Sequence, residues 1–309
     1  MRVEQVTPAY NKKDLLIAIS AFFMWGVLPV YWKQLKAVSA MEILAHRIIW
    51  SLVFLLLLLL SSRKFKPFLR ECIEVLRDKK RFSILVLSAV FLNINWLTYI
   101  WAVNNDYIVQ TSLGYYINPI LSVFLGLFVL RERLSTLLWI SFALILLGVM
   151  MMVFKAGIFP WIGLILAFSF ALYGLLKKLN PLPAISSLTL ETLISSLPSI
   201  GYLLFIASKG QSSFFQGFSS IQLYLMGGGA VTALPLIFFS MGAKRLPLYM
   251  IGFFQYIGPS IALFLGVFLY HETFSLAHLL SFSLVWLGLT FFSLNVYRQL
   301  RNAKIDRLN

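Results

Sequence analysis

Long apolar runs, separated by short polar connections, dominate the pattern along this chain. A helix that crosses the hydrocarbon core of a bilayer needs about 20 mostly apolar residues. The sequence offers ten such runs, so it predicts an all-α polytopic membrane protein with ten transmembrane helices. The predicted spans are residues 15–32, 42–61, 82–103, 109–130, 136–154, 160–176, 188–207, 222–241, 247–270 and 275–296.

The composition supports a membrane location and excludes a soluble globule. Of the 309 residues, 60% are hydrophobic and 12% are charged, whereas a soluble domain carries roughly 25% charged residues. Too little polar surface is left to cover a water-facing fold. The first apolar run, residues 15–32, follows charged residues and is long enough to span, so we interpret it as a retained helix.

The net charge of +15 is explained by membrane topology. Lysine and arginine favour the cytoplasmic side of a membrane. With the N-terminus inside, the inside segments hold 21 lysines and arginines and the outside segments hold four. This asymmetry predicts that both termini are cytoplasmic. It also favours the anionic headgroups of the cytoplasmic face as a partner, in place of a nucleic acid.

The motifs of soluble enzymes are missing from the sequence. The chain has no GxxxxGKS/T phosphate loop, no HExxH and no GxSxG. One cysteine, Cys72, and three histidines cannot supply a Cys-rich or His-rich metal centre. We therefore expect no cofactor, no metal and no enzymatic activity.

A stretch in the second half of the chain repeats one in the first half. Residues 116–135 and 256–275 are identical at nine of twenty positions when the sequence is shifted by 140 residues. The alignment continues without a gap to Gly148 and Gly288. Because proline, glycine and glutamate coincide inside apolar segments, we interpret the match as an internal repeat of five helices.

The second copy of the repeat is predicted to be inverted, because five spans are an odd number. Arg131 and Arg133 follow the fourth predicted helix, and both arginines are replaced at the equivalent turn of the second copy, as an outside turn requires. We assign residues 1–155 to the first repeat and 156–309 to the second. Inverted repeats are typical of secondary transporters, which bind substrate near the midplane.

Two matched helices, the fourth and the ninth, carry aromatic and polar residues beside a proline. Tyr115 and Pro119 fall on one stripe of the fourth helix, and Gln255, Tyr256 and Pro259 form the matching stripe of the ninth. Each proline frees a backbone carbonyl, which is tolerated at membrane depth where it faces protein or a wet cavity. We interpret the prolines as hinges and the other residues as substrate-binding; simple helix packing is the alternative.

The third predicted helix carries Asn93, Asn95, Trp96 and Tyr99. Polar groups inside a membrane usually face the interior of the helix bundle. The aromatic rings could stack on a flat or amphipathic substrate while the amides provide polar contacts. The alternative is that the asparagines bond neighbouring helices.

Few charged residues lie inside the predicted spans. Arg47 lies about 7 Å from the outer end of the second helix. It could hold a substrate carboxylate or phosphate, or it could pair structurally with Glu42 or with a carbonyl. Glu191 and His46 are candidates for proton coupling, with an interfacial structural role as the alternative for Glu191 and an ordinary packed histidine for His46.

Several motifs extend over nearly the whole chain: EILAHRIIWS from Glu42, NINWLTYIWAV from Asn93, SLGYYINP from Ser112, PW at Pro160, SFALYGLLKK from Ser169, TALPL from Thr232 and GFFQYIGPSIALFLGVFLYHE from Gly252. Together these motifs resemble those of the RarD family, which belongs to the EamA-type transporters of the drug/metabolite transporter superfamily. That resemblance implies a carrier of the bacterial inner membrane with ten helices in a five-plus-five inverted arrangement. Members of the wider superfamily move amino acids, other metabolites, nucleotide sugars and small drugs, often outward.

The inverted repeat and the proline-containing helices favour a secondary transporter that works by alternating access. The expected cargo is a small amphipathic metabolite, an amino-acid-like compound or a drug, held between the two repeats. An uncoupled channel or facilitator for small metabolites is the alternative. The sequence leaves open the direction of transport, the coupling ion and the choice between monomer and homodimer.

Overall fold

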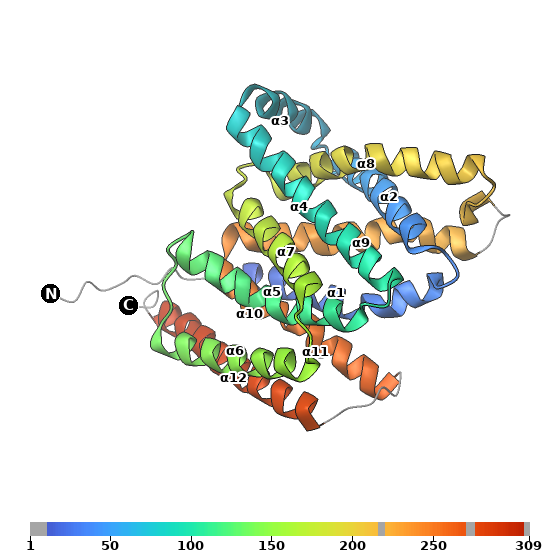
Figure 1. Ribbon diagram of the computed structural model, residues 1–309. Helices are drawn as coiled ribbons and strands as arrows, with labels where there is room; N and C mark the ends of the chain where they lie inside the picture. The colour runs from blue at the N-terminus through green and yellow to red at the C-terminus, as the bar shows by residue number, and fades with distance from the viewer. Residues whose placement is uncertain (1–10, 216–219, 270–275, 306–309) are drawn as a thin grey trace.

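Helices account for nearly all of the chain that the computed structural model describes, which is residues 11–215, 220–269 and 276–305. No strand occurs within those ranges (Figure 1). Ten spans are long and apolar enough to cross a membrane, as predicted. The α-helices are α1 (Lys12–Trp32), α2 (Ala40–Ser61), α3 (Phe65–Arg77), α4 (Lys79–Asn104), α5 (Ile108–Phe128), α6 (Thr136–Ala156), α7 (Trp161–Leu179), α8 (Ala184–Ser208), α9 (Ser220–Arg245), α10 (Leu248–Gln255), α11 (Ile257–Phe264) and α12 (Leu276–Ile305).

Most helices extend beyond the apolar run that predicts them, because a helix continues to its capping residue. The predicted span 82–103 lies within α4, which begins at Lys79. The side chain of Asp78 accepts hydrogen bonds from the backbone N–H groups of Lys80 and Arg81, and so caps this start. The apolar run therefore measures the hydrocarbon thickness, and the cap fixes the helix length.

The basic connection after α2 forms an amphipathic helix of its own, α3. Phe68 and Val75 are buried against the bundle, whereas Leu69, Ile73 and Leu76 are exposed. α3 packs against α2, α4 and α8 and lies at the edge of the bundle in Figure 1.

Helices from the two halves of the chain alternate in space. α1 packs against α9, and α7 packs against α4. These two contacts are equivalent in the repeat, because α7 is the counterpart of α1 and α9 is the counterpart of α4. α6 packs against α12, and α5 packs against both α7 and α10. The main core therefore forms between the halves. The repeat boundary between residues 155 and 156 stays a prediction.

A reciprocal contact joins α6 and α12, which are equivalent helices of the repeat. A Cβ atom at Gly148 would lie 2.7 Å from the carbonyl oxygen of Ser281, and one at Gly288 would lie 2.8 Å from that of Ser141. Gly148 corresponds to Gly288 and Ser141 corresponds to Ser281 under the 140-residue shift. Each glycine therefore permits the close approach of the serine backbone opposite it.

The ninth span is broken, whereas its counterpart is continuous. α10 ends at Gln255 and α11 begins at Ile257, followed by a π-helical turn, Leu265–Leu269. Pro259 has no backbone N–H to bond the carbonyl of Gln255, so it accounts for the break. α5 runs without interruption through Pro119. Of the two predicted hinge positions, only Pro259 coincides with a break in the helix.

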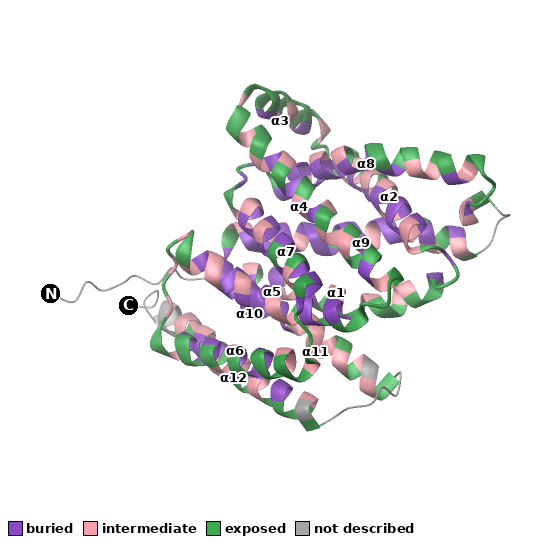
Figure 2. Cartoon of the chain, viewed as in Figure 1, coloured by how far each residue is buried: buried purple, intermediate pink, exposed green. Residues whose placement is uncertain are grey.

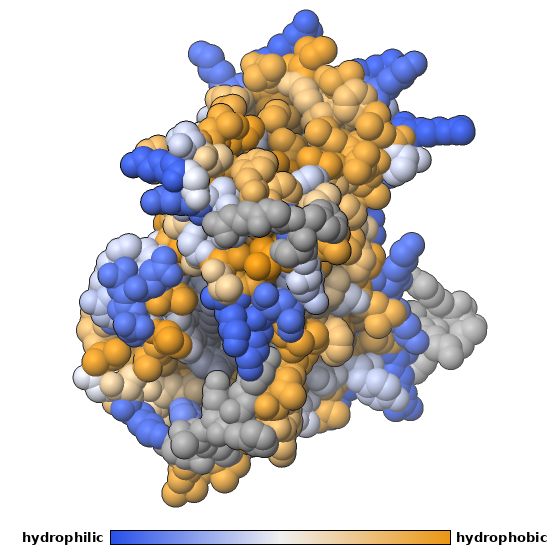
Figure 3. Space-filling model, turned by 90° about the vertical axis from the view of Figure 1, so that its right-hand side faces the viewer, coloured by the Kyte–Doolittle hydropathy of each residue, from blue (hydrophilic) through white to orange (hydrophobic). Residues whose placement is uncertain are grey.

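The surface matches the predicted membrane environment. Buried residues follow the inner faces of the helices, and exposed residues lie on the periphery (Figure 2). Large apolar side chains, including Phe128, Phe154 and Leu197, are exposed around the bundle. Apolar side chains cover much of the face in Figure 3, and polar side chains gather in separate groups. Exposing such a large apolar surface to water is unfavourable, whereas exposing it to the hydrocarbon of a bilayer is not.

Candidate functional site

Arg47 lies within α2 at a point where helices from both halves of the chain meet. Its Nε donates a hydrogen bond to Oγ1 of Thr232 in α9, at 3.0 Å. The centre of its guanidinium lies 4.6 Å from the ring centroid of Trp32 and 5.4 Å from that of Trp96. Two indole rings therefore hold the cation by cation–π attraction, which strengthens when water is excluded.

No carboxylate within the described residues forms an ion pair with Arg47. Glu42, the structural partner considered from the sequence, bonds elsewhere: its Oε1 accepts from Oγ of Ser212 at 2.9 Å and from the backbone N–H of Ser213 at 2.7 Å. A cation at membrane depth is costly without an anionic partner. The arrangement therefore favours an anion supplied from outside the chain.

Glycines of α9 allow the close contact between this helix and the Arg47 region. A Cβ atom at Gly228 would lie 3.4 Å from the ring of Trp32 and 3.6 Å from Cγ of Arg47. The neighbouring carbonyl of Gly229 accepts a hydrogen bond from Oγ of Ser51 at 2.9 Å. The small residues bring α9 close to α2, and this closeness lets Thr232 reach Arg47.

Two tyrosines complete the group. The rings of Tyr99 in α4 and Tyr115 in α5 lie 6.1 Å apart, tilted at 62°. Both lie near Arg47, and both are exposed, at 37% and 51%. The structure thus brings four of the predicted binding residues together, and we call the resulting group the Arg47 cage. Its members are Trp32, Arg47, Trp96, Tyr99, Tyr115 and Thr232.

The predicted asparagines are turned toward neighbouring helices instead of the cage. Nδ2 of Asn93 donates to Oγ of Ser195 in α8 at 2.7 Å. Nδ2 of Asn95 donates to Oγ of Ser169 in α7 at 3.1 Å and to the carbonyl of Leu166 at 2.8 Å. The geometry matches the alternative interpretation, in which these amides bond adjacent helices.

Gln255 and Tyr256 also lie away from the cage, in the contact between α5 and α10. Nε2 of Gln255 donates to Oγ of Ser122 at 3.2 Å, and the hydroxyl of Tyr256 donates to the carbonyl of Tyr116 at 3.0 Å. Both residues are buried. In this conformation they join the two halves and do not line an open surface.

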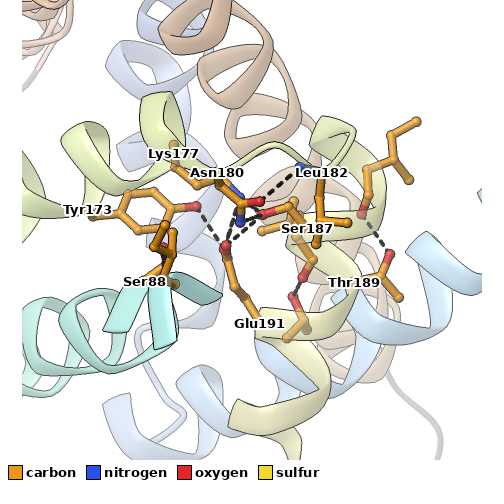
Figure 4. A network of polar contacts seen from close by, with 12 residues as sticks. Ser88, Tyr173, Lys177, Asn180, Leu182, Ser187, Thr189 and Glu191 are labelled. Carbon is orange, nitrogen blue, oxygen red and sulfur yellow. Dashed lines mark hydrogen bonds and ion pairs between the residues drawn. The ribbon is translucent and has the colours of Figure 1, made fainter. Parts of the chain in front are cut away.

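Glu191 belongs to a buried polar network that the sequence only half revealed (Figure 4). Its carboxylate accepts hydrogen bonds from Nζ of Lys177 at 2.9 and 3.0 Å, from Oγ of Ser187 at 2.8 Å and from the hydroxyl of Tyr173 at 3.3 Å. Lys177 and Glu191 are 0% and 1% exposed. The ion pair links α7 to α8.

The sequence pattern places Lys177 only among the basic residues of a predicted cytoplasmic connection. The missed signal is its helical spacing: Lys177 lies four residues after Tyr173, on the same face of α7. Ser187 and Glu191 share a face of α8 for the same reason. A lysine on the stripe of a buried tyrosine indicates a buried partner.

His46, the second coupling candidate, is buried beside an aromatic ring. It stacks on Phe214 with ring centroids 4.8 Å apart, and its Nε2 lies 4.0 Å from Oε1 of Glu42. Within the described residues no group of three His, Cys, Asp or Glu side chains could hold a metal ion.

Comparisons with known proteins define the class of this chain as an integral, multi-pass membrane transporter. The model of the EamA-like transporter family matches residues 12–154. The uncharacterized transporter YojE of Bacillus subtilis is 42% identical over 296 residues, covering 96% of this chain and 98% of that protein. Protein RarD of Streptomyces exfoliatus is 40% identical over 294 residues, covering 95% and 92%.

The chain therefore belongs to the RarD family of EamA-type transporters. A solved crystal structure with 18% sequence identity superposes with a TM-score of 0.70, covering 93% of this chain and 99% of that one. At this identity the likeness concerns the fold alone. It agrees with the ten-helix arrangement described above.

Proposed function

We propose that this protein is a secondary transporter of the bacterial inner membrane that binds a small amphipathic anion or zwitterion at the Arg47 cage. The observation that carries the proposal is a half-buried arginine whose cation has aromatic and hydroxyl partners but no carboxylate partner within the described residues. An amino-acid-like compound, another carboxylate-bearing metabolite or a drug with an anionic group fits this site.

The cage restricts how a ligand can approach the guanidinium. Trp32 and Trp96 lie against the cation, and Thr232 occupies its Nε–H. The two terminal nitrogens remain for a ligand, and a planar carboxylate can bond both at once. The exposed rings of Tyr99 and Tyr115 supply an apolar wall for the rest of the molecule.

Alternating access is the mechanism that the helix arrangement supports best. Arg47 and Thr232 come from different halves, so a relative movement of the halves would change access to the cage and its geometry together. We propose that both termini and α3 lie on the cytoplasmic side, because basic residues concentrate there. The basic residues of α3 would then meet anionic lipid headgroups.

An uncoupled facilitator would share the cage but would not concentrate its substrate. The buried pair of Lys177 and Glu191 favours coupling over this alternative, because a buried carboxylate and a buried ammonium could exchange a proton as partners move apart. Uptake measured with and without a proton gradient separates the two, since only a coupled carrier accumulates substrate against its gradient.

A thermal-shift screen of the purified protein tests the site. Amino acids, other small carboxylates and anionic antibiotics serve as probes, and a ligand that binds the folded state raises the melting temperature. Compounds that stabilise the wild type should stabilise Arg47→Lys much less and Arg47→Met not at all. Arg133→Lys, at an exposed position, is the matched control and should behave as wild type.

Transport in proteoliposomes, measured with a compound found in that screen, completes the test. Arg47→Ala should abolish concentrative uptake, whereas Asn93→Ala should reduce it only as far as it weakens the contact with α8. Wild-type uptake by Arg47→Ala would overturn the assignment of the cage.

A further inference from the structure

Glu132 lies between α5 and α6 and reaches across to the other half of the chain. Its Oε1 accepts a hydrogen bond from the backbone N–H of Leu248 at 2.7 Å, and its Oε2 accepts one from Tyr249 at 2.9 Å. These are the first two N–H groups of α10. The preceding residue, Pro247, makes no side-chain capping bond. One carboxylate from the first half therefore caps a helix of the second half.

The backbone around Glu132 is shaped to present its carboxylate. Arg131 has a φ of 55°, a left-handed conformation that a non-glycine residue adopts at a cost. This turn lets the N–H of Glu132 donate to the carbonyl of Gly126 at 2.9 Å. A Cβ atom at Gly126 would lie 2.5 Å from Oε2 of Glu132 and 3.0 Å from the backbone nitrogen of Tyr249. Glycine is therefore required for the carboxylate to fit.

The capping contact lies in a buried environment. Leu248 and Tyr249 are 0% and 4% exposed, and the side chain of Glu132 is 12% exposed. Nζ of Lys178 lies 3.8 Å from Oε1 of Glu132 and donates to the carbonyl of Leu246 at 2.6 Å. Buried N–H groups need a partner, so α10 cannot move away from Glu132 without water or another acceptor replacing the carboxylate.

The contact holds one end of the bundle only. α10 packs extensively against α5, whereas α11, the other piece of the ninth span, packs against α1. Arg245, at the end of α9 and close to the start of α10, forms an ion pair with Asp14 at 2.7 Å. The start of α1 therefore lies at the same end of the bundle as the contact between Glu132 and α10. That end carries the start of α1 and the end of α12 (Figure 1) and is cytoplasmic in the proposed orientation.

We propose that Glu132 is a positioning residue for α10 that acts as a latch: it keeps the cytoplasmic end of the transport path closed in this conformation and releases α10 when that end opens. The latch rests on the proposed transport function and on the proposed orientation. In this proposal the carboxylate of Glu132 makes the contact that closes this end of the bundle, between α5 and α10, which belong to different halves of the chain.

Distance measurements between two spin labels test the latch without any substrate. Labels are attached to cysteines at Lys13 in α1 and Leu179 in α7, both exposed, in the full chain carrying Cys72→Ser. α1 packs with α9, α10 and α11, and α7 packs with α5, so the pair reports the separation at this end. Pulsed double electron–electron resonance gives the populations in lipid nanodiscs.

Wild type should show mainly the short, closed distance. Glu132→Gln should raise the ratio of open to closed molecules by about tenfold, the effect expected when one charge-assisted hydrogen bond is lost. Gly126→Ala displaces the carboxylate without removing it and should shift the populations in the same direction. Glu74→Gln, whose side chain is 62% exposed in α3, is the control and should leave them unchanged.

Unchanged distances in both Glu132→Gln and Gly126→Ala, in proteins that elute as folded wild type does, would overturn the latch. Transport at wild-type rates with these unchanged distances would leave the proposed function intact while removing the latch. A distance shift in Glu132→Gln, in a protein that transports none of the stabilising compounds, would support the contact between Glu132 and α10 and would count against the proposed transport function.

Discussion

Lys177 and Glu191 form an ion pair with 2.9 Å between Nζ and Oε1, and both side chains are buried almost completely. Ser187, on the same face of α8 as Glu191, bonds both partners: its Oγ accepts from Nζ of Lys177 and donates to Oε1 of Glu191, at 2.8 Å each. Nearby, Nζ of Lys244 in α9 donates to the carbonyls of Asn180 and Leu182. The network therefore connects α7, α8 and α9 at the end of the bundle where α1 begins.

Removing one member of this pair should be much worse than removing both. Lys177→Met leaves a buried carboxylate without its cation, and we expect a loss of about 3–5 kcal/mol of stability. The double variant Lys177→Met, Glu191→Leu should recover most of that loss, because it leaves no unpaired charge. Melting temperatures in a single detergent measure the difference. Equal losses in the single and double variants would show that the pairing itself contributes little.

Thr232 should stabilise the Arg47 cage through its hydroxyl. Thr232→Val removes the acceptor for Nε of Arg47 and leaves a half-buried donor unsatisfied, which costs about 1–3 kcal/mol. Thr232→Ser keeps the acceptor and should remain closer to wild type. Thermal unfolding of the three proteins checks this order. A serine variant as unstable as the valine variant would indicate that the methyl group matters and the hydrogen bond does not.

A side chain at Gly288 should disturb the packing of α6 against α12. Its Cβ would lie 2.6 Å from Cγ1 of Ile145 and 2.8 Å from the carbonyl of Ser141. Overpacking of this kind costs about 1–3 kcal/mol, which lowers the melting temperature. Gly201→Ala is the matched control, because nothing lies within 4 Å of its Cβ position in α8. That change should be neutral or stabilising by about 0.5–1 kcal/mol, since alanine favours a helix.

Cys72 should react slowly with maleimides at neutral pH. Burial raises the pKa of the Cys72 thiol, and the neighbouring charge of Glu71 raises it further. Because the thiolate is the reactive form, a raised pKa lowers its fraction at neutral pH relative to a free thiol, whose pKa is about 8.5. The labelling rate should keep rising with pH beyond the point where the SDS-denatured chain levels off. The chain has one cysteine, so mass spectrometry of the intact protein follows the reaction directly. Coincident pH profiles for native and denatured protein would contradict the expectation.

Much of the candidate site could be foreseen from residue type and helical spacing. Trp96, Tyr99 and Tyr115 stand out as aromatic residues on polar stripes of long apolar helices, and Arg47 stands out as a charge inside one. The structure places all four in the cage. The partners that complete it were not foreseeable in the same way. Nothing in the sequence around Thr232 indicates that its hydroxyl faces Arg47, which lies on a different helix.

The number of spans, the excess of basic residues on one side and the inverted repeat can all be read from the amino-acid sequence alone. Each of these depends on properties that accumulate along a stretch of chain, such as apolar length and charge count, and they hold whatever the neighbouring helices are. Which polar groups contact one another is known only once the helices are packed together. Asn93 and Asn95 bond α8 and α7, Lys177 pairs with Glu191, and Glu132 caps α10. Those contacts depend on how each helix is rotated about its axis and on which helix lies beside it, and close packing between the two halves fixes both.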